Sequence, residues 1–214
     1  GGAVLLREPE LLHAIVRAVR AATPAQVPVT AKMRLGYDDT ALALDCAQAL
    51  ATAGAAEIVV HARTKTEGYR PPAHWDWIAR IREAVTVNVV ANGEIWTLQD
   101  AQRCLEISGS QDLMLGRGLV ARPDLAGQIA SWASGRPEVV LDWPGMRLVV
   151  TQFWGLLQAY ADGAYPQARL KQWLALVAQA FPAARPLLES VRRQPDSHSV
   201  AACLADDTYW QVGR

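Results

Sequence analysis

Four short apolar runs of this sequence end in residues that can bind an anion. One run passes from two valines directly into "HARTKTEGYR" (61–70), which holds a histidine, three cations and a tyrosine. The others end in Lys32 and Arg34, in "ANGEI" (91–95) and in "LGRG" (115–118). A solvated turn would explain charge at one such end. Four polar ends in succession instead predict a ligand that carries negative charge.

The third and fourth ends have the composition of a phosphate site. Glycines such as Gly93 and Gly116 let backbone N–H groups approach an anion closely. Arg117 adds a guanidinium, which can bind two phosphate oxygens at once. Barrels of eight βα units commonly build a phosphate site after their seventh and eighth strands. Together with Asn92 one strand earlier, these residues predict phosphate binding.

Lys32 and Arg34 are two residues apart on an expected strand, so they share one face about 7 Å apart. A lysine on a covered face of a sheet is costly unless an anionic group meets it. That group is either a ligand or a structural carboxylate. For His61 the alternatives are a ligand contact or a structural histidine, and for Tyr69 they are a substrate contact or a solvated loop.

The elements that position these ends alternate between strand and helix. Short β-rich runs occupy residues 27–35, 57–63, 87–95 and 112–118, and apolar residues at helical spacing fill 40–54 and 98–108. Asp39 or Thr40 and Thr97 are the predicted N-caps. Four βα units fit either an open doubly wound sheet or half of a barrel. Because all four ends are polar, we predict an α/β fold that forms the C-terminal half of a TIM (β/α)8 barrel over residues 1–135.

The pattern changes near "SGRPEVVLDWPG" (134–145), after which only helical periodicity remains. We expect a second, all-helical domain over residues 136–214. In "ARLKQWLALV" (168–177), Arg169 and Lys171 flank an apolar stripe that includes Leu170, Trp173 and Leu174. A tryptophan in such a stripe is expected to belong to the core.

Composition limits the function further. The 214 residues carry a formal net charge of zero, so binding of a polyanion must depend on a local patch. The three cysteines have no metal-ligand spacing and favour a reducing cytoplasm, and no apolar run is long enough to cross a bilayer. We therefore expect a cytoplasmic protein with no metal site and no membrane contact.

The strand ends "AKMRLG", "VVHARTKTEGYR", "ANGEIW" and "LGRG", in this order and spacing, resemble the tRNA-dihydrouridine synthase family of FMN-dependent barrel enzymes. The tail with "ARLKQWL" is similar to the bacterial subfamily C, whose members reduce the D-loop uridine at position 16. The opening "GGAVLL" resembles the segment that follows the family's catalytic cysteine. The resemblance therefore implies that the proton-donor cysteine lies upstream of Gly1, that no catalytic residue lies in this chain, and that the chain alone is inactive.

The resemblance also implies FMN as cofactor, NADPH as reductant, tRNA as partner and a monomeric full-length enzyme. Flavin contacts are expected from these residues: Lys32, His61, Asn92, Gly93, Glu94, Gly116 and Arg117. Glu94 would contact phosphate through its backbone N–H, because its carboxylate would repel the anion. RNA contacts are expected from these residues: Arg34, Tyr69, Arg169, Lys171 and Arg192. Two alternatives remain, namely an FMN barrel that acts on a small molecule, such as a dihydroorotate dehydrogenase-like enzyme, and a non-catalytic tRNA-binding fragment.

Overall fold

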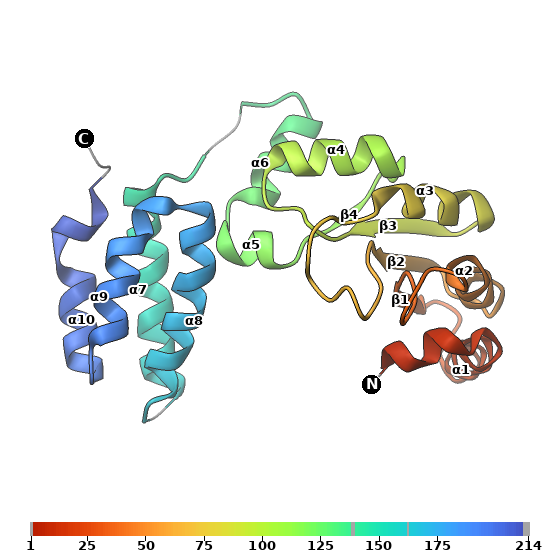
Figure 1. The fold of residues 1–214 in the computed structure, drawn as a ribbon, viewed down its shortest axis with the longest axis horizontal. Coiled ribbons are helices and arrows are strands. Elements are labelled where there is room, and N and C mark those ends of the chain that lie inside the picture. The colour runs from red at the N-terminus through yellow and green to blue at the C-terminus, as the bar shows by residue number, and fades with distance from the viewer. Residues whose placement is uncertain (1, 138–139, 162, 212–214) are drawn as a thin grey trace. The chain divides into compact units, whose positions relative to one another are not determined.

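The structure is a computed structural model that describes residues 2–137, 140–161 and 163–211. It divides into two compact units, Gly1–Gly116 and Arg117–Arg214. The first unit is α/β and the second is helical (Figure 1). This confirms the predicted fold class.

In the first unit, helices and strands alternate along the chain. Its elements are η1 (Gly2–Arg7), α1 (Pro9–Ala22), β1 (Thr30–Arg34), α2 (Ala43–Thr52), β2 (Glu57–His61), α3 (Trp75–Ala84), β3 (Asn88–Asn92), α4 (Leu98–Ser108) and β4 (Leu113–Met114). All neighbouring strands are parallel, in the order β1-β2-β3-β4. This order never reverses, as a barrel requires, whereas a doubly wound sheet has a point where the order switches.

The two faces of this sheet differ in burial. One face is covered by helices and buries apolar side chains, namely Met33, Ile58, Val60, Val89 and Ala91. On the opposite face, Thr30, Lys32 and Asn88 are exposed. The opposite face is mixed, because Val59, Val90 and His61 on it are buried.

A side-chain cap explains where α4 begins, whereas α2 begins without one. Thr97 starts α4 with a capping box, in which its side chain accepts from Asp100 N while the Asp100 carboxylate accepts from the Thr97 N–H. The prediction of Asp39 or Thr40 as the cap of α2 is wrong, because Leu42 is the N-cap and offers no side-chain hydrogen bond. Asp39 instead accepts from Ala41 N in the turn before the helix.

The second unit consists of helices and short 3-10 turns. Its elements are α5 (Arg117–Ala121), α6 (Leu125–Ala133), α7 (Trp143–Tyr160), α8 (Tyr165–Ala180), η2 (Pro182–Ala184), α9 (Arg185–Arg193), α10 (Ser197–Ala205) and η3 (Asp207–Trp210). Its core is built from α7 to α10 and closes with Trp210, which stacks on Trp143 at a centroid distance of 4.8 Å. As expected from the stripe, Leu170 and Leu174 are fully buried, whereas Trp173 is only partly buried.

The division between the units lies at Gly116, earlier than the boundary expected after residue 135. Helices α5 and α6 belong to the helical unit because hydrogen bonds join them to it. Trp173 Nε1 of α8 donates to Val120 O of α5 at 2.8 Å, and the Asp124 carboxylate accepts from Leu141 N at 2.7 Å. The first unit thus ends directly after the fourth strand.

Candidate functional site

The carboxyl ends of the strands meet in one register row. Arg34 pairs with His61, His61 with Asn92, and Asn92 with Met114. In-register residues of parallel strands point to the same face of the sheet. Three of the predicted site residues therefore lie side by side at one edge of the sheet.

Lys32 reaches across the sheet to this row. Its Nζ donates to Asn92 Oδ1 at 3.0 Å, and Asn92 Nδ2 donates to Met114 O at 2.6 Å. Partial burial of its ammonium group, and then the charge of Arg34, lower the pKa of Lys32, although the residue as a whole is exposed. Lys32 forms none of the ion pairs found among the described residues. It is an ammonium group held by a neutral amide, which is the environment expected for a residue that meets an anionic ligand.

Gly93 follows the row at a place where only glycine fits. Its φ is +122°, a conformation that side chains rarely adopt, and a Cβ there would lie 3.1 Å from His61 Cδ2. Its carbonyl accepts from Trp75 Nε1 at 2.9 Å. The backbone after β3 is thereby held close to the His61 ring, which is itself buried.

Arg63 and Glu94 form an ion pair that joins the segment after β2 to the segment after β3. Arg63 is fully buried, and its Nε also donates to Pro72 O at 3.1 Å. Glu94 has a left-handed backbone with φ of 57° and accepts from Trp96 Nε1 at 3.2 Å. Because its carboxylate is committed to these partners, Glu94 does not present free negative charge at the strand ends.

The sequence marked Arg63 only as one of three cations after the second strand that can bind an anion, and it did not predict its pairing with Glu94. The available signal was Glu94 itself. A carboxylate beside a predicted phosphate site requires a neutralising cation, and Arg63 stands at the end of the neighbouring strand.

The loop after β2 is held over the same edge by Arg34. Arg34 Nη1 donates to Thr64 O at 2.9 Å and to Gly68 O at 3.0 Å, and its Cζ lies 5.4 Å from the centre of the Tyr69 ring. The Tyr69 ring also lies 6.0 Å from the His61 ring and is 60% exposed. The structure thus brings Arg34, His61 and Tyr69 together, with an aromatic face open to solvent.

The fourth strand end has a different setting. Gly116 is the last residue of the first unit, and a Cβ there would meet no atom within 4 Å. Arg117 is the first residue of α5 and belongs to the second unit. The pair is therefore adjacent in the chain but divided between the units.

The helical unit holds three of the four cations predicted to contact RNA, on α8 and α9. Lys171 Nζ donates to Arg192 O at 3.4 Å and to Gln194 O at 3.5 Å, at the carboxyl end of α9. Arg192 forms an ion pair with Glu189 at 2.7 Å. Arg169 donates to Gln172 on the other side of α8. Lys171 and Arg192 are therefore neighbours, and Arg169 is separate from them.

The cysteines have structural surroundings. Cys46 in α2 and Cys104 in α4 are fully buried, and burial is the main cause that raises the pKa of Cys46 to about 11 and of Cys104 to about 12. Cys203 in α10 lies 3.2 Å from the Ser190 hydroxyl. None of these thiols lies in the register row at the strand ends.

Over residues 2–137, 140–161 and 163–211, no three histidine, cysteine or acidic side chains are grouped as a metal ion would require. Within the same ranges, no helix has the length and apolar character needed to span a bilayer.

Comparison with known proteins gives a consistent assignment. The family described as "Dihydrouridine synthase (Dus)" matches residues 1–205. The tRNA-dihydrouridine(16) synthase of Pseudomonas syringae pv. tomato is 54% identical over 208 residues, which is 97% of this chain and 66% of that protein. Proteins of the same name from Aquipseudomonas alcaligenes and Neisseria meningitidis serogroup B are 55% and 49% identical, over 96% of this chain and 65% and 62% of their own lengths. The chain thus spans about two thirds of the length of these relatives.

Proposed function

The chain belongs to the dihydrouridine synthase family, and we therefore propose that the protein reduces a uridine of tRNA to 5,6-dihydrouridine. The names of the relatives, tRNA-dihydrouridine(16) synthase, support position 16 as the target. Since the chain spans about two thirds of those relatives, the proposed activity is that of the whole protein. A tRNA substrate also supports a cytoplasmic location, and we expect the protein to act as a monomer.

Enzymes of this family are flavin-dependent, and the residues at the strand ends fit FMN. Lys32 supplies a cation that no carboxylate of the described residues neutralises, and Asn92 orients it. Because Gly93 has no side chain, a ligand can approach the backbone next to His61. Bound FMN would supply the hydride for the uracil ring, with NADPH as its reductant. The positive charge of Lys32 would balance the negative charge that a flavin gains on reduction.

The phosphate end of the cofactor would be bound by backbone and cation together. Gly93, Gly116 and the Glu94 N–H offer close backbone approach, and Arg117 offers a guanidinium. The pairing of the Glu94 carboxylate with Arg63 supports this role, because it removes the repulsion that a free carboxylate would exert on phosphate.

The substrate would meet Arg34 and Tyr69. An enzyme that acts on a base must remove it from its stack, and an exposed aromatic ring beside a guanidinium suits that task. Arg169, Lys171 and Arg192 would contact phosphates of the tRNA from the helical unit. The first unit would thus perform the chemistry while the second contributes RNA affinity.

The single observation that carries the proposed function is the contact at 3.0 Å by which Lys32 reaches Asn92 in the row of strand ends. Its test is flavin retention by the protein expressed from its complete reading frame. We expect the parent to purify with one bound FMN and Lys32→Met to lose FMN about tenfold more readily, as for the loss of one charged contact. The charge-matched control, Arg103→Met, changes an exposed cation on α4 and should retain FMN as the parent does.

A colourless parent protein that ignores added FMN would refute the flavin proposal. A protein that binds FMN, oxidises dihydroorotate and leaves tRNA unchanged would instead be an FMN barrel enzyme that acts on a small molecule.

A further inference from the structure

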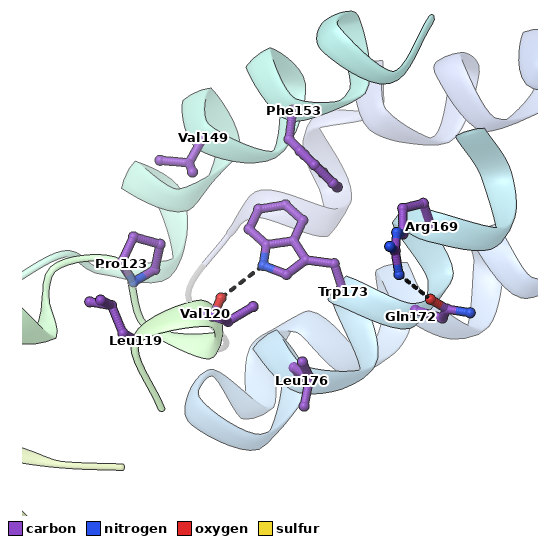
Figure 2. Close-up of a pocket in the computed structure, with 9 residues that line it drawn as sticks. All are labelled: Leu119, Val120, Pro123, Val149, Phe153, Arg169, Gln172, Trp173 and Leu176. Atoms are coloured by element: carbon purple, nitrogen blue, oxygen red, sulfur yellow. Dashed lines mark hydrogen bonds between the residues drawn. The ribbon is translucent and has the colours of Figure 1, made fainter. Parts of the chain in front are cut away.

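The helical unit contains a pocket of about 480 Å³ to which the proposed chemistry assigns no role. It lies between α5, α7 and α8, entirely within the second unit (Figure 2). It is lined mainly by apolar side chains, with two polar ones from α8: Leu119, Val120, Pro123, Val149, Phe153, Arg169, Gln172, Trp173 and Leu176. Its size falls within the range of sites for small organic groups, about 300–1,000 Å³.

Trp173 forms a rigid aromatic surface in this pocket. Its Nε1 donates to Val120 O at 2.8 Å, and the Phe153 ring meets it edge-on at a centroid distance of 4.7 Å and an angle of 66°. Figure 2 shows the indole among the lining side chains, with Phe153 pointing toward it from α7. Because the hydrogen bond and the ring contact both fix its orientation, Trp173 can receive a planar group without first being ordered.

Arg169 gives the pocket a positive edge. Its Nη1 donates to Gln172 Oε1 at 3.0 Å, and its Cζ lies 5.7 Å from the centre of the exposed Tyr165 ring. Arg169 takes part in none of the ion pairs between described residues, and no lining residue that the structure describes is acidic. The edge is therefore a cation beside aromatic rings, with no carboxylate to neutralise it.

An aromatic surface with a guanidinium at its edge matches one ligand chemistry. A nucleotide presents a flat base, which stacks on aromatic rings, and a phosphate, which arginine binds. An apolar protein segment would also fill such a groove, but it offers no partner for the charge of Arg169. Resting on the proposed tRNA substrate, we propose that this pocket receives the base of an unpaired tRNA nucleotide while Arg169 binds its phosphate. Since Trp173 Nε1 is already committed to Val120 O, recognition is by stacking and tolerates different bases.

The test is tRNA affinity as a function of salt concentration for the protein expressed from its complete reading frame. Val149→Trp fills the pocket, and Leu148→Trp places the same side chain on the exposed face of the same helix, outside the lining. We expect Val149→Trp to weaken binding between about 5- and 150-fold, the range that stacking of one base accounts for, with the salt slope unchanged. Leu148→Trp should bind as the parent does. Arg169→Gln should weaken binding and reduce the salt slope by about one unit, because one phosphate contact is lost.

If Val149→Trp and Leu148→Trp bind tRNA with equal affinity, the pocket does not receive a nucleotide. An apolar protein segment would then be its ligand. If Val149→Trp fails to fold, as judged by its circular dichroism, Trp173→Leu carries the same test, since it removes the aromatic surface while keeping an apolar side chain. A parent protein that binds no tRNA at all contradicts the proposed function. If the parent protein binds tRNA and Val149→Trp binds it equally well, only the nucleotide pocket is contradicted.

Discussion

At the residue scale, the charge of Lys32 is held in place without being neutralised. An amide acceptor such as Asn92 Oδ1 at 3.0 Å fixes the direction of the ammonium group. A carboxylate in place of the Asn92 amide would have neutralised the positive charge of Lys32 that an anionic ligand meets. The lowered pKa of Lys32, caused by burial and then by Arg34, reflects a charge that would be stabilised by such a ligand.

Tyr69 carries the first prediction at this scale. Its ring is 60% exposed and lies against Arg34 and His61, where the target base would enter. We expect Tyr69→Ala to lower kcat for dihydrouridine formation about tenfold or more, while the Kd for tRNA changes by less than about threefold. Tyr160→Ala, an exposed tyrosine of α7, is the control and should change neither. A loss of tRNA affinity as large as the loss of turnover would contradict this role.

Glu67 gives the loop a dependence on pH. Burial alone would raise the pKa of Glu67, but hydrogen bonds from Thr64 N at 2.6 Å and His74 Nε2 at 2.8 Å lower it below its ordinary value. The folded pKa is then below the unfolded value of about 4.3. Stabilisation by Glu67 is therefore complete above the unfolded pKa and is lost as the pH falls through the folded pKa.

The measurement is the difference in Tm between the parent and Glu67→Gln. We expect the parent to melt higher at neutral pH and the difference to shrink as the pH falls below about 4. A difference of the same size at pH 7 and at about pH 3 would exclude the carboxylate charge as its source.

The residue types at the site could be predicted, but their partners could not. The strand ends were readable because Lys32, His61 and Asn92 interrupt apolar runs. The contact of Lys32 with Asn92 spans from β1 to β3 and depends on side-chain length and direction. The same holds for Arg34, which was expected at the mouth for RNA but also donates to two carbonyls of the loop.

At the element scale, the helix over residues 98–108 and the strand positions were predictable, because apolar periodicity and the Thr97 capping box are local signals. The bounds of the fourth strand were predicted least accurately. A strand was expected over residues 112–118, but only Leu113–Met114 pair with β3. The glycines that follow favour a turn over continued pairing, and α5 begins at Arg117.

Arg63 carries the prediction at this scale, because it joins the ends of two strands. Lysine in its place keeps the charge but cannot bond Pro72 O and Glu94 together, since it lacks the fork of the guanidinium. We expect Arg63→Lys to lower the free energy of unfolding by about 1–3 kcal/mol, the cost of an unsatisfied buried polar group. Arg103→Lys on the exposed face of α4 should stay within about 0.5 kcal/mol.

Denaturant unfolding of both variants measures this difference. Equal stability of Arg63→Lys and Arg103→Lys would mean that a simple charge next to Glu94 is sufficient.

At the scale of the whole molecule, the two units divide the proposed work. The division at Gly116 was not readable from the sequence, because the helical pattern of α5 and α6 looks alike whether they cover a barrel or join a bundle. Long-range contacts, such as the bond from Trp173 to Val120, decide it. The proposed roles of flavin chemistry in the first unit and RNA binding in the second remain predictions.

The proposed activity can be tested in cells by the position of dihydrouridine in tRNA. Mass spectrometry of nuclease fragments from cells that lack this gene should show uridine in place of dihydrouridine at position 16, with the other dihydrouridines retained. Reintroduction of the gene should restore the modification, and the Lys32→Met version should restore less of it. Dihydrouridine that persists at position 16 in cells without the gene would contradict the account.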